Sequence, residues 1–161
     1  MATFSKRTLA ALLVAGLAAC NPTATEPVRG ANAVLPADRV TQPAFHKALN
    51  AARAQQGLGP LAPSNILVRV AQDHARDMAQ RAYFAHVSPE GQSAMDRAVT
   101  NNVPACGIGE NIAFGQDAPM QAFSSWMASP GHRANMLHPK MRSYGLAREG
   151  DIWVLMVQSP C

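Results

Sequence analysis

The stretch CGIGENIAFG, Cys106–Gly115, decides how the rest of the chain is interpreted. As a β-strand it alternates faces with period two, so Ile108, Glu110 and Ile112 share one face and Asn111 lies on the other. A carboxylate therefore interrupts an apolar row. Burying an ionised carboxylate costs several kcal/mol unless a cation, a hydrogen-bond donor or a metal ion compensates its charge. The rest of the chain has to supply the partner of Glu110.

Length and charge point to one small domain and argue against nucleic acid as a partner. The chain has 161 residues, 48% of them hydrophobic, which is enough for a single core. The 14 Lys and Arg include Lys6 and Arg7 of a predicted leader; without these two, 12 basic residues face 10 acidic ones, a formal charge of +2. Because this charge is small and not clustered, we expect no nucleic-acid partner. We expect a monomer.

The N-terminal segment MATFSKRTLAALLVAGLAAC has the order of a secretory signal, with a basic start and an apolar run too short to span a bilayer. Its end, Leu17-Ala18-Ala19-Cys20, resembles the lipobox of bacterial lipoproteins, in which the signal is cut before a cysteine that becomes lipidated. We therefore predict a signal peptide over residues 1–19 and an exported protein, anchored in the cell envelope through a lipid on Cys20. The alternative is an ordinary signal peptide cut near Ala18 or Ala19.

Export places the two remaining cysteines, Cys106 and Cys161, in an oxidising compartment, where we expect them to form a disulfide. The loop so closed is long, and the bridge stabilises the fold by about 4 kcal/mol in the chain-entropy model. The alternatives are two buried thiols, or a nucleophilic Cys106 near a histidine. A bridge would exclude both.

Pattern along the chain predicts a tether followed by one α+β domain. Residues 20–40 contain three prolines and no sustained periodicity, which is typical of a tether that reaches at most about 70 Å. The domain is expected over residues 41–161. Helical spacing predicts a helix from about residue 43 to Gly57, a second after Ser64, a short one through Met95 and one over about 118–128. Two strands around a Gly150-Asp151 turn end the chain, so we expect a sheet between helical layers.

Three histidines need weighing one by one. His74 lies on the apolar stripe of the second helix, where a packed histidine bonded to a backbone carbonyl is favoured. His86 precedes the predicted turn Ser88–Gly91, and His132 follows the Ser129-Pro130-Gly131 break. Each alone is more typical of a hydrogen-bonded surface residue than of a ligand. An arginine, Arg97 or Arg133, would satisfy Glu110 without any function.

The order of the motifs resembles a known family. HARDMAQRAYFAHVSPEGQSAMDRA, then GENIAFG, then WMASPGHRANML, then YGLA and an apolar last strand resemble the bacterial branch of the CAP superfamily, which includes cysteine-rich secretory, antigen 5 and pathogenesis-related (SCP-like) proteins. The resemblance covers residues 41–161. It implies a three-layer α-β-α sandwich with a small central antiparallel sheet and a cleft on which histidines and acids converge.

The family pattern carries over residue by residue. His86 matches the histidine of F-x-H-x-S-P-x-G, Glu110 the acid of G-E-N-I, and His132 the histidine of S-P-G-H-R-A-N. Where many eukaryotic members have a second acid, counting from the helix tryptophan leads to Ser129. The resemblance thus implies that Glu110 faces His86 and His132 across the cleft floor, with the two histidines as metal ligands in one alternative.

Three functions stay open at this point. The first is a lipid-anchored binding module whose cleft (His86, Glu110, His132) holds a divalent metal such as zinc, a lipid or a peptide, with no cofactor required. The second is a metal-assisted hydrolase of peptides or cell-wall material, with His86 and His132 as ligands and Glu110 as general base. The third is a structural envelope protein in which the same residues form a satisfied polar network. We favour the first, because none of the matched motifs supplies an activated nucleophile.

Overall fold

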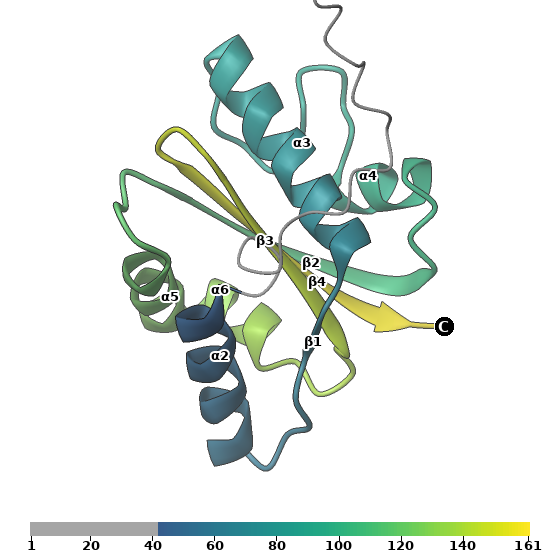
Figure 1. The fold of residues 1–161 in the computed structure, drawn as a ribbon. Helices are drawn as coiled ribbons and strands as arrows, with labels where there is room; N and C mark the ends of the chain where they lie inside the picture. The colour runs from purple at the N-terminus through teal and green to yellow at the C-terminus, as the bar shows by residue number, and fades with distance from the viewer. Residues whose placement is uncertain (1–41) are drawn as a thin grey trace, which may run out of the picture. The chain divides into compact units, whose positions relative to one another are not determined.

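The computed structural model describes residues 42–161, so the predicted signal peptide of residues 1–19, Cys20 and the predicted tether lie outside the described residues. The helices, in chain order, are α2 (Pro43–Gln55), α3 (Asn65–Arg81), α4 (Ala94–Thr100), α5 (Pro119–Ala128) and α6 (Pro130–Met136) (Figure 1). The strands are β1 (Ala62–Pro63), β2 (Ala105–Phe114), β3 (Ser143–Glu149) and β4 (Ile152–Pro160). Within this part of the chain, no helix combines the length and apolarity that a membrane span requires.

The sheet has four strands in the order β1-β3-β4-β2. β4 lies between β2 and β3 and pairs with both in antiparallel orientation. The predicted turn between the last two strands is confirmed, because Glu149 pairs with Ile152 and Gly150 adopts a positive φ of 54°. The antiparallel sheet is therefore confirmed for the three long strands. The two-residue β1, which was not predicted, joins β3 in parallel orientation.

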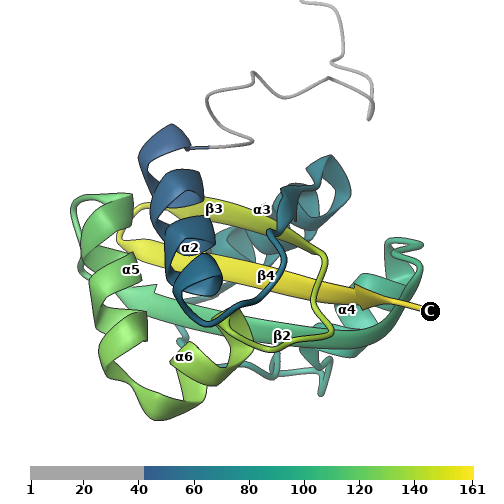
Figure 2. The same cartoon turned by 90° about the horizontal axis from the view of Figure 1, so that it is seen from below.

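Helices cover both faces of the sheet, which gives the predicted three layers (Figure 2). One core lies between the sheet and α2, α5 and α6, and the other lies between the sheet and α3 and α4. β4 supplies both, because Trp153, Leu155 and Val157 belong to the first core, and Ile152, Val154 and Met156 belong to the second. The last strand is therefore apolar on both faces because both faces are covered.

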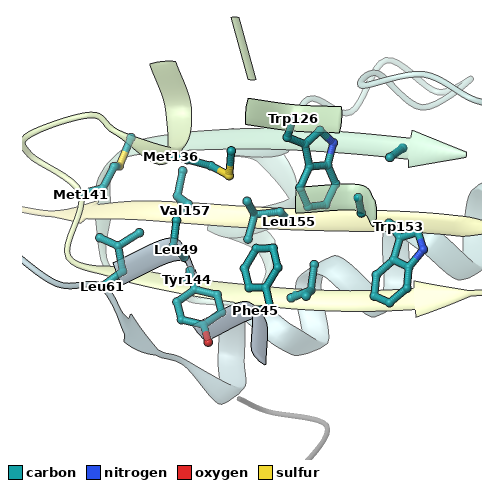
Figure 3. Packing of buried hydrophobic residues seen from close by; sticks show 13 residues of the cluster. Phe45, Leu49, Leu61, Trp126, Met136, Met141, Tyr144, Trp153, Leu155 and Val157 are labelled. Carbon is teal, nitrogen blue, oxygen red and sulfur yellow. The ribbon is translucent and has the colours of Figure 1, made fainter. Parts of the chain in front are cut away.

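The first core is built around aromatic rings (Figure 3). Phe45 of α2 packs edge-to-face on Trp126 of α5, with ring centroids 6.2 Å apart. Trp126 is 1% exposed and donates its indole N–H to the Ile112 carbonyl at 3.1 Å, which ties α5 to β2. Trp126 is therefore a residue of the core.

A close helix-to-strand contact fixes α3 against β3. A Cβ atom at Gly145 would lie 2.2 Å from the backbone carbonyl carbon of Leu67 and 2.3 Å from the backbone nitrogen of Val68. No side chain fits there without moving backbone, so glycine is required by the approach of α3. This contact sets the depth at which α3 side chains meet the face of the sheet that carries Glu110.

One buried cation in this part of the chain is structural. Arg53, at the end of α2, is fully buried and donates hydrogen bonds to the carbonyls of Gly59, Met136 and His138 at 2.7, 2.8 and 3.1 Å. It thereby joins the end of α2 to the loop that follows α6. Its burial was not predicted from the sequence, because most of its carbonyl partners, such as Met136 and His138, lie more than 80 residues away along the chain and leave no local pattern.

The predicted disulfide between Cys106 and Cys161 is present, with an S–S distance of 2.16 Å, and it ties the start of β2 to the C-terminus.

The predicted break at Ser129-Pro130-Gly131 does end α5, but a further helix, α6, begins at Pro130. His132 therefore lies in the first turn of a helix, because proline is well tolerated at the first helical position.

Candidate functional site

Glu110 is buried at the middle of β2, where two side chains donate hydrogen bonds to its carboxylate and a third lies close to it. Its own side chain is 3% exposed. Arg97 of α4 donates from Nη2 to Oε2 at 2.7 Å, and His86 donates from Nδ1 to Oε1 at 2.8 Å. The Nε2 atom of His74, on α3, lies 3.7 Å from Oε1. These cationic and N–H groups are the partners that a carboxylate on an apolar row requires.

The carboxylate does lie between two imidazoles, but the second is His74. Among residues 42–161, no hydrogen bond or ion pair joins the side chain of His132 to Glu110. Of the three predicted cleft residues, the structure therefore brings His86 and Glu110 into direct contact. His132 reaches the same strand from the opposite face of the sheet.

Arg97 makes the burial of Glu110 possible and shapes the loop beside it. Its side chain is 8% exposed. Besides Glu110 it donates to the carbonyls of Gln92 and His86, both at 2.9 Å. Arg97 thus holds the loop before α4 against β2 and brings the imidazole of His86 within reach of Glu110. Of the two arginines considered as partners, Arg97 is the one present, and Arg133 is exposed.

The loop that carries His86 is rigid through local hydrogen bonds. The predicted turn is confirmed by the bond from the Gly91 N–H to the Ser88 carbonyl at 2.8 Å. Ser88 also donates its N–H to the Gln92 carbonyl at 3.0 Å, and its hydroxyl oxygen accepts from the Gln92 N–H at 3.2 Å. The backbone around His86 is therefore fixed from both sides, by this turn and by Arg97.

His86 presents one ring nitrogen outward. Its side chain is 52% exposed, and Nδ1 is engaged by Glu110. Nε2 makes no hydrogen bond to any residue in the described part of the chain. The hydrogen bond to Glu110 raises the pKa of His86 above its usual value of 6.5, and this effect outweighs partial burial, which acts in the opposite direction. Below pH 6.5 the ring is therefore an imidazolium whose outward Nε2–H can donate.

His132 is held through its backbone and remains half-buried. Its carbonyl accepts a hydrogen bond from the Asn111 amide at 2.9 Å, while Asn135 donates to the Glu110 carbonyl and the Asn111 side-chain oxygen. Asn111 therefore bonds the backbone of α6, on the face of the sheet opposite to the Glu110 side chain. Burial lowers the pKa of His132, and the positive charge of His86 lowers it further, so the two imidazoles sense each other electrostatically.

His74 is a packed histidine, as predicted, with one contact that the sequence did not predict. It is 1% exposed and donates from Nε2 to the Ala85 carbonyl at 3.1 Å. Burial lowers its pKa, although the charge of Glu110 opposes this shift. His74 meets Glu110 because the apolar stripe of α3 covers the face of the sheet that carries the Glu110 side chain. The sequence predicts the stripe, but it does not predict which face of the sheet the stripe covers.

A pair of exposed aromatic rings lies at the end of β2, four residues beyond Glu110. Phe84 and Phe114 pack edge-to-face with centroids 6.0 Å apart, although they are 47% and 62% exposed. Phe114 lies on the same face of β2 as Glu110, because the two are four residues apart, and Phe84 lies two residues before His86. Exposed phenylalanines in contact with each other are unusual on a surface that has no partner.

The donor set does not fit a metal site with three protein ligands. Within residues 42–161, no group of three or more His, Cys, Asp or Glu side chains is arranged to hold a metal ion. Both oxygens of Glu110 are already engaged by His86 and Arg97. That leaves two imidazoles, whereas catalytic zinc sites use three protein ligands. The remaining histidines, His46 and His138, bond the Tyr144 hydroxyl and the Lys140 N–H instead.

Four cavities of about 250, 500, 440 and 430 Å³ open on the described residues, and none of these four includes His86, Glu110 or His132 in its lining. The third of them borders the Phe84–Phe114 pair.

Comparison with known proteins gives one family. A sequence model of the cysteine-rich secretory protein (CAP) family matches residues 46–151. The uncharacterized protein YkwD of Bacillus subtilis strain 168 is 38% identical over 106 residues, which cover 65% of this chain and 41% of YkwD. The uncharacterized membrane protein YlbC of the same strain is 33% identical over 97 residues, which cover 60% of this chain and 28% of YlbC. The chain thus spans less than half the length of these relatives.

Solved structures agree on the fold. An extracellular protein of Bacillus anthracis that contains an SCP domain is similar with a TM-score of 0.69 and 26% identity, covering 78% of this chain and 44% of that one. An outer surface protein of Borrelia burgdorferi is similar with a TM-score of 0.70 and 18% identity, covering 77% of this chain and 96% of that one.

Proposed function

We propose that this chain, which belongs to the cysteine-rich secretory protein (CAP) family, is an exported, lipid-anchored domain. It binds a ligand that carries a carboxylate or phosphate group, and it does not catalyse a reaction of that ligand. The binding surface is the one around His86 and His132. One observation carries the proposal: Glu110 holds Nδ1 of a half-exposed His86, so that the other ring nitrogen points outward without a partner in the described residues.

The chemistry of His86 favours an acidic group as the ligand. An imidazole with a raised pKa is a cation at mildly acidic pH, and its free N–H donates a charge-assisted hydrogen bond to a carboxylate or phosphate oxygen. Arg97 adds positive charge behind Glu110, whose carboxylate neutralises only one of the two cations that it contacts. The site therefore carries a net positive charge when His86 is protonated.

Turnover is disfavoured by the same contacts. A general base needs a free oxygen within reach of the proton that it takes, and both oxygens of Glu110 accept strong hydrogen bonds. Cys106 is bonded to Cys161, so it offers no thiolate. These facts weigh against the hydrolase alternative and leave a binding role, or a purely structural network, as the alternatives to be separated by experiment.

Export and anchoring rest on the leader and on the nature of the relatives. One similar structure is described as an extracellular protein and another as an outer surface protein. The basic start, the short apolar run and Cys20 supply the lipoprotein signal. We expect the full chain to fractionate with membranes and Cys20→Ser to abolish this attachment; a Cys20→Ser protein that stays in the membrane fraction would contradict lipid anchoring.

The binding proposal is tested by titrating acetyl-triglycine, and its C-terminal amide, into the soluble chain of residues 21–161 at about pH 6. This chain suffices because both hydrophobic clusters and the disulfide lie within residues 42–161. Backbone amide NMR spectra report the site of binding. We expect saturable shifts around His86 and His132 with the carboxylate peptide and much weaker shifts with the amide.

Three variants make the test specific. His86→Asn keeps an N–H close to the Nδ1 position for Glu110 but removes Nε2, and His132→Ala removes the second imidazole. His138→Ala, an exposed histidine elsewhere, is the matched control. Both site variants should weaken binding and the control should not. Equal binding of peptide and amide would leave the structural network as the better account, and tight one-to-one zinc binding lost in both site variants would replace the acidic ligand by a metal.

A further inference from the structure

An apolar groove lies beside the His86 surface. It has a volume of about 440 Å³, and its lining includes Met78, Ala82, Tyr83, Phe84, Phe114 and Ile152. Met78 and Ile152 form a buried floor, with 0% and 5% exposure, and the two phenylalanines form a wall that is itself half-exposed. We call it the aromatic groove. A wall of this kind gains free energy when an apolar group covers it.

The aromatic groove and His86 both border β2, at different positions along it. His86 contacts Glu110, and Phe84 contacts Phe114, so residues 84–86 run beside β2 from Phe114 back to Glu110. Glu110 and Phe114 are four residues apart on one face of the strand, which corresponds to about 13 Å. A ligand that reaches both places therefore needs the length of about four residues of extended chain.

The far end of the groove is acidic. Glu149 and Asp151, at the β3–β4 turn, belong to its lining, and the side chain of Asp151 is 65% exposed. Arg148 lies 3.7 Å from Asp151, but it also donates to the carbonyls of Gly150 and Asp117. Two carboxylates and one arginine leave this end with one net negative charge. The surface thus runs from a cationic imidazole, past apolar rings, to carboxylates.

We infer that the ligand of this surface is a short peptide with free termini, whose terminal carboxylate binds His86, whose apolar side chain fills the aromatic groove and whose ammonium group faces Glu149 and Asp151. The inference rests on the proposed function for its carboxylate contact. Its support is charge complementarity at both ends and the match between about 13 Å and four extended residues.

The alternative occupant with a carboxylate and an apolar part is a fatty acid. Its carboxylate would suit His86 equally well, but its alkyl tail would end against Glu149 and Asp151. Covering these carboxylates with hydrocarbon removes them from water, and the alkyl tail offers them no hydrogen bond or positive charge in exchange, which is unfavourable. The acidic end of the groove therefore favours a peptide over an acyl chain.

The test uses Leu-Gly-Gly-Gly with both termini free, titrated into the soluble chain of residues 21–161 and followed by amide NMR spectra. Tetraglycine lacks the apolar side chain, acetyl-Leu-Gly-Gly-Gly lacks the ammonium group and Leu-Gly-Gly-Gly amide lacks the carboxylate. We expect the loss of leucine to weaken binding about tenfold, because it leaves the groove exposed. Loss of either charged terminus should weaken it about two- to fivefold, as expected for exposed ion pairs.

Variants locate the effect. Phe84→Ser and Phe114→Ser should each remove the advantage of Leu-Gly-Gly-Gly over tetraglycine, and Asp151→Asn should remove the advantage over the acetylated peptide. Val99→Ser, a change at a residue of α4 that is 63% exposed and outside the groove, is the matched control and should change nothing.

The outcomes separate the inference from the function on which it rests. If the carboxylate still matters and His86→Asn still weakens binding, but leucine and the ammonium group make no difference, the peptide inference is wrong and the proposed function stands. If carboxylate and amide bind alike, the proposed function fails as well. Decanoate that binds more tightly than Leu-Gly-Gly-Gly, and independently of Asp151, would assign the surface to a fatty acid instead.

Discussion

Replacing Glu110 by glutamine should destabilise the fold by about 3 kcal/mol, the lower end of the cost of breaking a buried ion pair. Glu110 and Arg97 have side chains that are 3% and 8% exposed, so removal of the negative charge leaves a buried guanidinium without its counter-charge. Glutamine keeps the size of the side chain and one oxygen for Arg97, which is why the lower end applies. For a domain of this size the melting temperature should fall by about 10 °C.

The assay is urea unfolding of the soluble chain of residues 21–161 with the disulfide kept oxidised, wild type beside Glu110→Gln. Glu149→Gln is the matched control, because Glu149 is half-buried and accepts a hydrogen bond from the Gln72 amide rather than from a cation. The control should lose about 1 kcal/mol or less. The urea dependence should stay unchanged, so that the difference reports stability alone.

A double variant checks the physical cause. Glu110→Leu alone leaves Arg97 buried and unpaired, whereas Glu110→Leu with Arg97→Met replaces both charges by apolar groups. The pair should therefore regain part of the stability that the single change loses, with a coupling of about 0.5–3 kcal/mol. The reasoning is refuted if Glu110→Gln costs no more than Glu149→Gln, because Glu110 would then not be a buried, charge-compensated group.

Three further tests concern the pKa values of the histidines, the close contact between Gly145 and the backbone of α3, and the disulfide. In imidazole NMR titrations, His86 should have a pKa above 6.5 that falls in Glu110→Gln, while His74 and His132 should titrate below 6.5. The contribution of His86 to the free energy of unfolding is then complete below pH 6.5 and is lost as the pH rises through its folded-state pKa, whereas His74 makes the fold less stable as the pH falls below 6.5. Unfolding of Glu110→Gln, measured across this pH range, should lack the contribution of His86. The same pH profile in wild type and variant would contradict this contribution. Gly145→Ala should cost about 3 kcal/mol in urea unfolding, because its Cβ would meet the backbone of α3, while Gly131→Ala, which meets nothing within 4 Å, should cost nothing; similar values for the two would disprove the close approach. Removal of the disulfide by Cys106→Ser with Cys161→Ser should cost about 4 kcal/mol, given a sequence separation of 55, and a loss near zero would show that the bridge does not restrict the unfolded chain.

Most of the fold could be predicted because its signals are local. The alternation in β2 and the two-sided apolar run of β4 identify the strands, and the helical spacing from Leu67 to Met78 identifies the buried face of α3. β1 could not be predicted, since two residues carry no periodicity. α6 was missed because Pro130 and Gly131 are typical of a break, although Ser129 and Pro130 equally suit the start of a new helix.

The site could be predicted only in part, because its contacts are tertiary. The need for a partner follows from the place of Glu110 in the strand, and the family pattern adds His86. Which of Arg97 and Arg133 compensates Glu110 depends on where α4 packs, and the contact of His74 depends on which face α3 covers. Neither can be read from spacing along the chain. The exposure of Phe84 beside Phe114 likewise becomes visible only when the loop and the strand are placed together.

The most direct test of the central claim is the imidazole nitrogen spectrum of His86 at about pH 6, recorded with and without acetyl-triglycine. If His86 presents Nε2 to an acidic ligand while Glu110 retains Nδ1, the Nε2 signal shifts in a saturable way and the Nδ1 signal stays close to its position in the free protein. The C-terminal amide leaves both signals in place. An Nε2 signal that does not move, or that moves equally with the amide, would contradict the claim that this surface binds an acidic group.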